Sequence, residues 1–315
     1  MRPTTTPSAD DVLDRGIPQG VSMPEAERFA EQRLAAAPWW WATARDLIPA
    51  SDRDVLVPVL ALLEFSFSLG GDSRDSARVQ ERWTWWRDEV ANARTGESIQ
   101  PLLIAVRPAV EAGLLDWSEI TRLLEAIAAD SGPRRYETWS DLEQPVMAIA
   151  KALRTVLLRA TSTKAADETA LDRMIAGVLL TDRIRTLRDG FLDRDRLVTP
   201  RADWPGPEFE VRLRDSALQG WGVDRAILEE SRTAIRATIE RIWPWYEAAE
   251  RMHESFEGLA RAWCWLAVHV GARVLQKIEL WNAETALRRP EVTRLRRFIL
   301  GWRARRERDC RSGSA

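Results

Sequence analysis

Acidic and basic side chains recur at a spacing suited to chemistry in one stretch of the sequence, residues 177–200. If the stretch is helical, with about 100° between successive residues, its polar side chains share a stripe roughly 80° wide. These polar residues are Asp182, Arg185, Asp189 and Asp193. The apolar residues gather on the opposite side, namely Leu180, Ile184, Leu187 and Phe191. We therefore expect one helix with a carboxylate face and a core face.

The carboxylate face contains a candidate metal site. Asp189 and Asp193 are four residues apart, which places their carboxylates roughly 6 Å apart on neighbouring turns of a helix. Carboxylate oxygens at this separation suit a hard divalent cation that is shared with a phosphate ligand. The alternative is an ordinary amphipathic helix whose charged side faces water.

The remainder of the sequence predicts helices that position this stretch. Alternating runs of Val, Ile and Thr between turn dipeptides are missing, and apolar residues recur instead at spacings of three and four. We expect an all-α protein with ten or more helices, in which residues 24–308 form a single large helical bundle. Residues 1–23 are expected to form a mobile arm, and residues 309–315 a tail.

Proline and glycine mark the boundaries of the early helices. A break is expected at Pro49, while Gly70 and Gly71 end one apolar helix and Gly113 separates the next two. The predicted helices cover residues 24–37, 52–69, 76–93, 102–112 and 117–129.

Composition excludes several classes of protein. The sequence has 46 Lys and Arg against 48 Asp and Glu, so its overall charge does not favour a nucleic-acid partner. Cys264 and Cys310 are too few and too far apart for a disulfide framework or a metal site, which favours the reducing cytoplasm. No apolar run reaches the roughly 18 residues of a membrane span, so no stable membrane insertion is expected. A monomer and a homodimer both remain open.

Tryptophan is unusually abundant, with 16 residues beside 2 Tyr and 7 Phe. So many indole rings imply either a heavily packed core or a cavity with aromatic walls. The tryptophans cluster near residues 39–41, 83–86 and 243–265. Trp83 and Trp86 are three residues apart on a helix with a charged far side, so we expect both in the core.

The order of motifs along residues 39–297 resembles the squalene/phytoene synthase family. Two groups of residues carry the resemblance: Asp130 with Arg135 and Tyr136, and Leu187-Arg188-Asp189 with Asp193. The second group is similar to the family's second aspartate-rich motif. The resemblance implies a bundle of the isoprenoid synthase type with a central cavity, a prenyl diphosphate donor, and Mg²⁺ bound by Asp189 and Asp193.

The resemblance also implies roles for individual residues. Arg188 joins Asp189 and Asp193 as a catalytic residue, and substrate binding falls to Asp182, Arg185, Arg135 and Tyr136. Arg185 and Asp182 stand where the family carries Asn and Gln, and Val198-Thr199 replaces a tyrosine of the family before Pro200.

The family's first aspartate-rich motif is lost from this sequence. Its aspartates align, depending on the register, with Phe67, Ser68 and Gly71 or with Gly70, Gly71 and Arg74. We interpret the nearby Asp72 and Asp75 as loop charges. A chain with one such motif is expected to hold one diphosphate, with an acceptor that carries none lying beside Phe67.

In these features the sequence resembles a divergent branch of the superfamily that prenylates carbazole rings with dimethylallyl diphosphate. An aromatic small-molecule acceptor would stack on tryptophan, and we assign Trp40 and Trp41 to its pocket because they align with the family's first substrate site. One alternative is a head-to-head synthase or terpene cyclase acting on a longer prenyl diphosphate. Another is a non-catalytic helical binding protein.

Two further features have simpler interpretations. His269 lies in an apolar run and is expected to be packed rather than to act as a general base. Residues 294–308 are basic and amphipathic, which is typical of a solvated last helix; contact with a membrane surface or with nucleic acid is the alternative.

Overall fold

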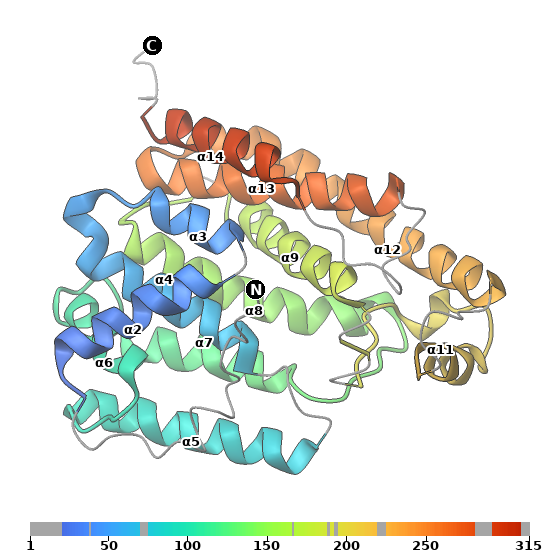
Figure 1. Ribbon diagram of the computed structural model, residues 1–315, viewed down its shortest axis with the longest axis horizontal. Coiled ribbons are helices and arrows are strands. Elements are labelled where there is room, and N and C mark those ends of the chain that lie inside the picture. The colour runs from blue at the N-terminus through green and yellow to red at the C-terminus, as the bar shows by residue number, and fades with distance from the viewer. Residues whose placement is uncertain are drawn as a thin grey trace, which may run out of the picture.

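The computed structural model describes residues 21–37, 39–69, 75–165, 167–187, 190–191, 195–218, 225–280 and 292–309. Within these ranges the chain forms twelve α-helices, and its one β-type pairing is an isolated bridge between Arg134 and Arg196 (Figure 1). The helices are α2 (Met23–Ala36), α3 (Trp39–Asp46), α4 (Arg53–Leu69), α5 (Ser76–Thr95), α6 (Pro101–Glu111), α7 (Trp117–Ala129), α8 (Trp139–Ala160), α9 (Glu168–Arg185), α11 (Phe209–Leu218), α12 (Arg225–Met252), α13 (Gly258–Leu280) and α14 (Arg294–Asp309). The all-α prediction is confirmed.

Capping residues explain why the early helices begin and end close to their predicted bounds. The Asp116 side chain accepts a hydrogen bond from the Ser118 backbone N–H, and Glu119 completes a capping box at the start of α7. Asp75 caps α5 in the same way, which agrees with its interpretation as a loop charge. Gly96 ends α5 in the left-handed conformation, with φ of 84°.

Helix α9 lies at the centre of the bundle, in contact with α8, α12 and α13. Helix α13 also packs against α12 and α14, so α14 forms an outer layer across the top of Figure 1. On the other side α4 packs against α2 and α6, and α7 against α8. Trp83 and Trp86 are each only 1% exposed on α5, which confirms that both belong to the core.

The predicted helix over residues 177–200 is interrupted, which corrects the expectation of one continuous helix. Regular α9 ends at Arg185, and Thr186 leaves helical geometry with φ of −107° and ψ of 24°. The Thr186 hydroxyl and backbone N–H both donate to the Asp182 carbonyl oxygen, at 2.8 Å and 3.0 Å. Helical geometry resumes at Leu187, and the Gly190 N–H donates to the Thr186 carbonyl oxygen at 2.8 Å. The predicted core face is confirmed, since Leu180, Ile184, Leu187 and Phe191 are all buried.

One tyrosine sets how closely three central helices approach. The fully buried Tyr246 of α12 shares a hydrogen bond of 2.9 Å with the Thr181 hydroxyl of α9. Its ring lies against the backbone of α13 at Gly271, where a Cβ atom would fall 2.5 Å from Cε1 and Cζ. No side chain fits there, because carbon atoms in contact are separated by about 3.5–4.0 Å. Gly271 therefore permits the packing of α13 on α12.

Replacing Gly271 with Ala is predicted to lower the free energy of unfolding by about 1–3 kcal/mol, because the new methyl group overlaps the Tyr246 ring. Gly177→Ala is the matched control on α9. Its Cβ would lie 3.5 Å from Ile242 and 3.6 Å from Tyr246, in ordinary contact. Alanine is also the better helix former, so this control should be neutral or stabilising by about 0.5–1 kcal/mol. Urea denaturation measures both, and equal effects would contradict the packing described.

Candidate active site

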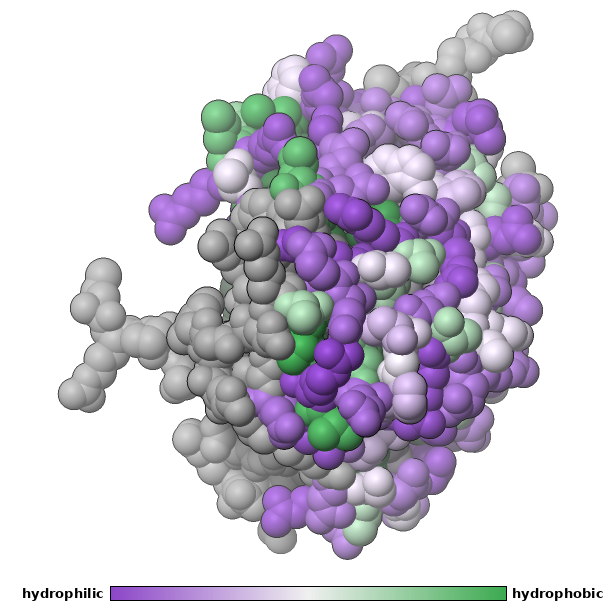
Figure 2. Space-filling model, turned by 90° about the vertical axis from the view of Figure 1, so that its right-hand side faces the viewer, coloured by the Kyte–Doolittle hydropathy of each residue, from purple (hydrophilic) through white to green (hydrophobic). Residues whose placement is uncertain are grey.

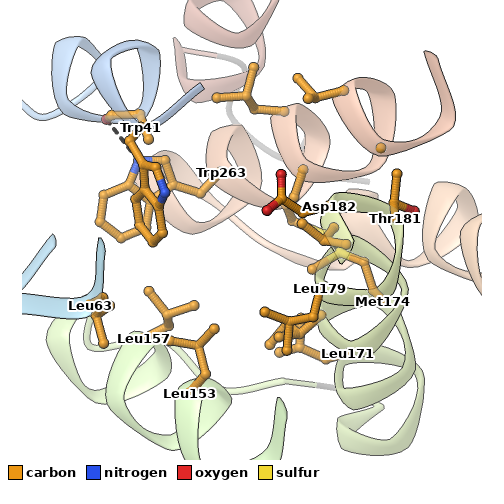
Figure 3. A pocket seen from close by; sticks show the side chains of 18 of the residues that line it. Trp41, Leu63, Leu153, Leu157, Leu171, Met174, Leu179, Thr181, Asp182 and Trp263 are labelled. Atoms are coloured by element: carbon orange, nitrogen blue, oxygen red, sulfur yellow. Dashed lines mark hydrogen bonds between the residues drawn. The ribbon is translucent and has the colours of Figure 1, made fainter. Parts of the chain in front are cut away.

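A cavity of about 390 Å³ lies between α3, α4, α8, α9 and α13 (Figure 3). Its walls are mainly apolar: Leu63 comes from α4, Leu153 and Leu157 from α8, and Leu171 and Met174 from α9. Val292, just before α14, and Arg297, in its first turn, also line the cavity. Such a space suits an apolar ligand that is fixed by a small number of polar groups.

Charged side chains of the described lining are confined to Asp182, Arg185 and Arg297. The Arg185 guanidinium donates twice to Asp182 Oδ1, from Nε at 2.9 Å and from Nη2 at 2.5 Å. The Asp182 side chain remains 45% exposed, whereas that of Arg185 is 11% exposed. Figure 3 shows the carboxylate of Asp182 directed from α9 toward the open part of the cavity. The two residues predicted from the polar stripe therefore do reach one cavity.

Two tryptophans face α9 across this space (Figure 3). Trp41, predicted as a pocket residue, comes from α3 and lines the cavity. Trp263 comes from α13, and its indole Nε1–H donates to the Ala44 carbonyl oxygen at 3.0 Å. Its polar atom is thus satisfied, which leaves the ring to serve as an apolar wall. Trp263 belonged to a predicted cluster but was missed as a site residue. Its spacing to Leu266, Ala267, Val270 and Val274 along one face of α13 was the available signal.

The other predicted site residues of the cavity lie outside the described part of the chain. Asp189, Asp193 and Arg188 fall in the two gaps that follow α9, and the side chains of Trp40 and Phe67 are likewise not described. Among the described residues, no three His, Cys, Asp or Glu side chains gather where they could hold a metal ion. The Mg²⁺ site thus remains a prediction that rests on Asp189 and Asp193.

Two titratable side chains of α13 have pKa values that burial shifts. Burial raises the pKa of the Cys264 thiol to about 12, so it is not a thiolate at neutral pH. Desolvation likewise lowers the pKa of His269, which stacks on Trp265 with ring centroids 3.9 Å apart. This confirms that His269 is packed, as expected.

A buried ion cluster lies around Asp130, at the end of α7. Its carboxylate accepts hydrogen bonds from Tyr136 Oη at 2.8 Å, Arg183 Nη2 at 2.6 Å and Arg196 Nη2 at 2.5 Å. Burial by itself would raise the pKa of Asp130, but Arg183, Arg196 and the Tyr136 hydroxyl outweigh it and hold the pKa below its usual range. Asp130 is therefore a charged residue of the interior.

Arg135 belongs to a second cluster beside the first. It donates to Glu210 at 2.8 Å from Nε and to Asp195 at 2.7 Å from Nη2. The backbones of Arg134 and Leu197 also pair, with a hydrogen bond of 3.2 Å. Arg135 and Tyr136 are not part of the described cavity lining, and they attach residues 195–197 to the connection before α8. Contact of Arg135 and Tyr136 with the substrate remains a prediction.

Comparisons with known proteins agree with this architecture. Residues 42–296 match the model of the family described as squalene/phytoene synthase. The crystal structure of squalene synthase HpnC from Alicyclobacillus acidocaldarius superposes with a TM-score of 0.63 at 17% identity, covering 82% of this chain and 95% of that one. A dehydrosqualene synthase crystallised with a ligand gives 0.67 at 12% identity, covering 90% and 96%. At such low identities these structures show a shared fold. No curated protein matches the sequence.

Replacing Asp130 with Asn is predicted to lower the free energy of unfolding by about 3–5 kcal/mol, because Arg183 and Arg196 would be left buried without a counter-charge. The Arg107–Glu111 pair on α6 offers a matched control, since Glu111 is 63% exposed. Glu111→Gln should cost less than about 1 kcal/mol.

The stabilisation by Asp130 also depends on pH. Because the folded-state pKa of Asp130 is depressed, its contribution to the free energy of unfolding is present above about pH 4, the unfolded pKa, and is lost as pH falls further through the folded pKa. Denaturation curves of wild type and Asp130→Asn should therefore converge only below about pH 4; convergence near pH 6 would contradict this assignment.

Proposed function

This chain belongs to the squalene/phytoene synthase family, and on that premise we propose that it transfers a prenyl group from an allylic prenyl diphosphate to an acceptor held in the apolar cavity. The observation that carries the proposal is the distribution of polarity in that cavity. Asp182 and Arg185 supply charge at the end of α9, directly before the aspartates of the predicted metal site, while the walls around Trp41 and Trp263 are apolar. One side of the space therefore suits a diphosphate and the remainder suits hydrocarbon.

The proposed reaction uses the charged side of the cavity first and its apolar side second. The bond between the prenyl C1 and the diphosphate oxygen breaks with both electrons on the diphosphate, and acceptor π electrons form the new bond to C1 before a proton is lost. Arg185 and Arg188 would donate hydrogen bonds to the diphosphate oxygens. Asp189 and Asp193 would hold Mg²⁺, which family members use to promote departure of the diphosphate.

The apolar walls would protect the allylic cation. Water that reached it would give an alcohol instead of a prenylated product, so a dry lining favours transfer. Ring faces of Trp41 and Trp263 would each stabilise positive charge by about 0.5–2 kcal/mol. Since Cys264 carries its proton, the described lining offers no thiolate to the cation.

Two acceptors are compatible with this scheme. The family match and the names of both similar structures support a second prenyl diphosphate, joined head to head as in a squalene or phytoene synthase. They support this candidate better than they support an aromatic acceptor.

The aromatic candidate rests on features of this chain. Neither alignment of the first aspartate-rich motif retains an aspartate, and Trp41 and Trp263 present rings to the cavity. A volume of about 390 Å³, near the lower end of the range for ligand pockets, suits a short donor beside one ring system. Transfer of a dimethylallyl group to a carbon of a carbazole-like ring is this second candidate.

The proposal is tested by incubating the purified protein with Mg²⁺ and prenyl diphosphates of 5 to 20 carbons, each alone and with a panel of carbazoles and indoles. Diphosphate release is expected, with products identified by mass. A coupled or cyclised hydrocarbon from the diphosphate alone supports the first acceptor, and a prenylated ring supports the second.

Asp189→Asn and Asp193→Asn should abolish diphosphate release with little change in melting temperature. Asp75→Asn, which changes the cap of α5, should retain most of the diphosphate release. Full activity in both site variants, or no release from any donor, would refute the proposal.

Trp41 and Trp83 should respond differently to truncation. Trp83→Ala is predicted to cost about 3–5 kcal/mol of stability, because the ring is packed on all sides. Trp41→Ala should cost less, since part of its ring already faces the cavity, and should raise the KM for an aromatic acceptor about tenfold or more. Melting temperatures and KM values for donor and acceptor separate the two effects. An unchanged acceptor KM in Trp41→Ala would remove this support for the aromatic candidate.

A further inference from the structure

The outer face of α14 carries a stripe of large apolar side chains. Leu295, Phe298, Ile299 and Trp302 recur at spacings of three and four residues, and they are 70%, 72%, 38% and 51% exposed. Residues at this spacing lie on one side of a helix, within an arc of about 100°. Isolated exposed apolar residues are common on proteins, but a continuous stripe of four large apolar side chains indicates an interaction surface.

The orientation of this stripe is fixed by packing on the opposite side of α14. Leu300 and Ala304 are buried, and α14 contacts α13 and α3. The Arg308 side chain also donates from Nη1 to the Leu47 carbonyl oxygen at 2.9 Å. At 100° per residue, the centre of the apolar stripe lies about 180° from Leu300 and Ala304. The stripe therefore points directly away from the bundle.

Arginines flank the stripe on both sides. Residues 294–309 contain seven arginines against Glu307 and Asp309, although the whole chain has a net charge of −2. Both acidic residues are engaged, Glu307 by Arg261 and Asp309 by Arg308. Among the residues that the structure describes, five arginines of this helix form no ion pair, namely Arg294, Arg296, Arg303, Arg305 and Arg306. Figure 2 shows a green apolar patch bordered by purple hydrophilic side chains at the upper left, where α14 lies.

We propose that α14 docks this protein on the surface of an anionic lipid bilayer, with Leu295, Phe298 and Trp302 in the interfacial layer and the arginines among the head groups. A helix with an apolar face bordered by basic residues lies in the plane of such an interface. A nucleic-acid site would place its basic residues at the centre of the contact. A second copy of this chain would bring the same unpaired arginines together, so self-association through the stripe is opposed by charge.

The contact is peripheral, because no described helix is long and apolar enough to cross a membrane. It lies close to the cavity, since Arg297 on the first turn of α14 is part of the cavity lining. The inference rests on the surface of α14 alone and does not require the proposed reaction.

Sedimentation with vesicles tests the docking directly. The full-length protein is mixed with vesicles of phosphatidylcholine containing about 30% phosphatidylglycerol, and with pure phosphatidylcholine vesicles. Binding to the anionic vesicles is expected at about 0.1 M salt, and it should weaken sharply at about 0.5 M salt, where surface charges are screened. Binding that is absent, or equal on the two kinds of vesicle, would overturn the proposal.

Substitutions separate the apolar and basic contributions. Phe298→Ser with Trp302→Ser should weaken binding about tenfold or more, whereas Arg303→Gln and Arg305→Gln should each weaken it roughly fivefold on the anionic vesicles only. Val211→Ser on α11 is the matched control, because Val211 is 61% exposed but lies on another helix. Melting temperatures of all variants should stay close to that of the wild type. If the double serine variant binds as the wild type does, α14 is not the docking surface.

Fluorescence provides an independent readout of insertion. Brominated lipids should quench the emission of Trp302, seen as the difference between the wild type and Trp302→Phe. Two other results would overturn the membrane assignment. The first is retention on duplex DNA that exceeds vesicle binding at the same salt and survives the double serine substitution. The second is a dimer, detected by light scattering without lipid, that the same substitution abolishes.

Discussion

The buried charge of Asp130 is the interaction on which the geometry of the candidate active site depends. A carboxylate with 2% exposure is tolerated only when matched by partners of opposite charge, and Arg183 and Arg196 provide them. Arg183 lies on the last turn of α9, and Arg196 follows the segment that carries Asp189 and Asp193. One ion cluster therefore holds both ends of that segment, although the cluster itself is outside the cavity.

Much of the fold could be predicted from local chemistry. Proline and glycine indicated approximate helix boundaries, which the structure shows to be set by caps such as Asp116 before α7 and Gly96 after α5. Spacing identified the buried face of α9. The same spacing placed Asp182 and Arg185 on one face, and both line the cavity. Spacing alone could not show that the helix is interrupted at Thr186, because apolar and polar side chains keep the same helical spacing on both sides of that residue.

The cavity walls were beyond prediction for a different reason. Leu63, Leu157 and Trp263 come from helices far apart in the sequence, and an apolar side chain that lines a cavity has the same local pattern as one in a solid core. Trp83 and Trp41 show the difficulty, since both are nearly buried but only Trp41 borders open space. The partners of Asp130 were equally hidden, because α9 has three arginines and no local signal distinguishes Arg183.

The packing of Tyr246 also limits how the cavity can change. Thr181 and Gly271 line the cavity on one side and contact Tyr246 on the other, so the tyrosine ring stands directly behind the cavity wall. A smaller residue at this position would extend the space between α9 and α13 toward α12, which under the proposed function leaves room for a longer hydrocarbon chain. It would also remove the group that holds these three helices at their present separation. Under the proposed function, substrate length and stability are therefore coupled at this residue, because the ring that limits the cavity also packs α9 against α12 and α13.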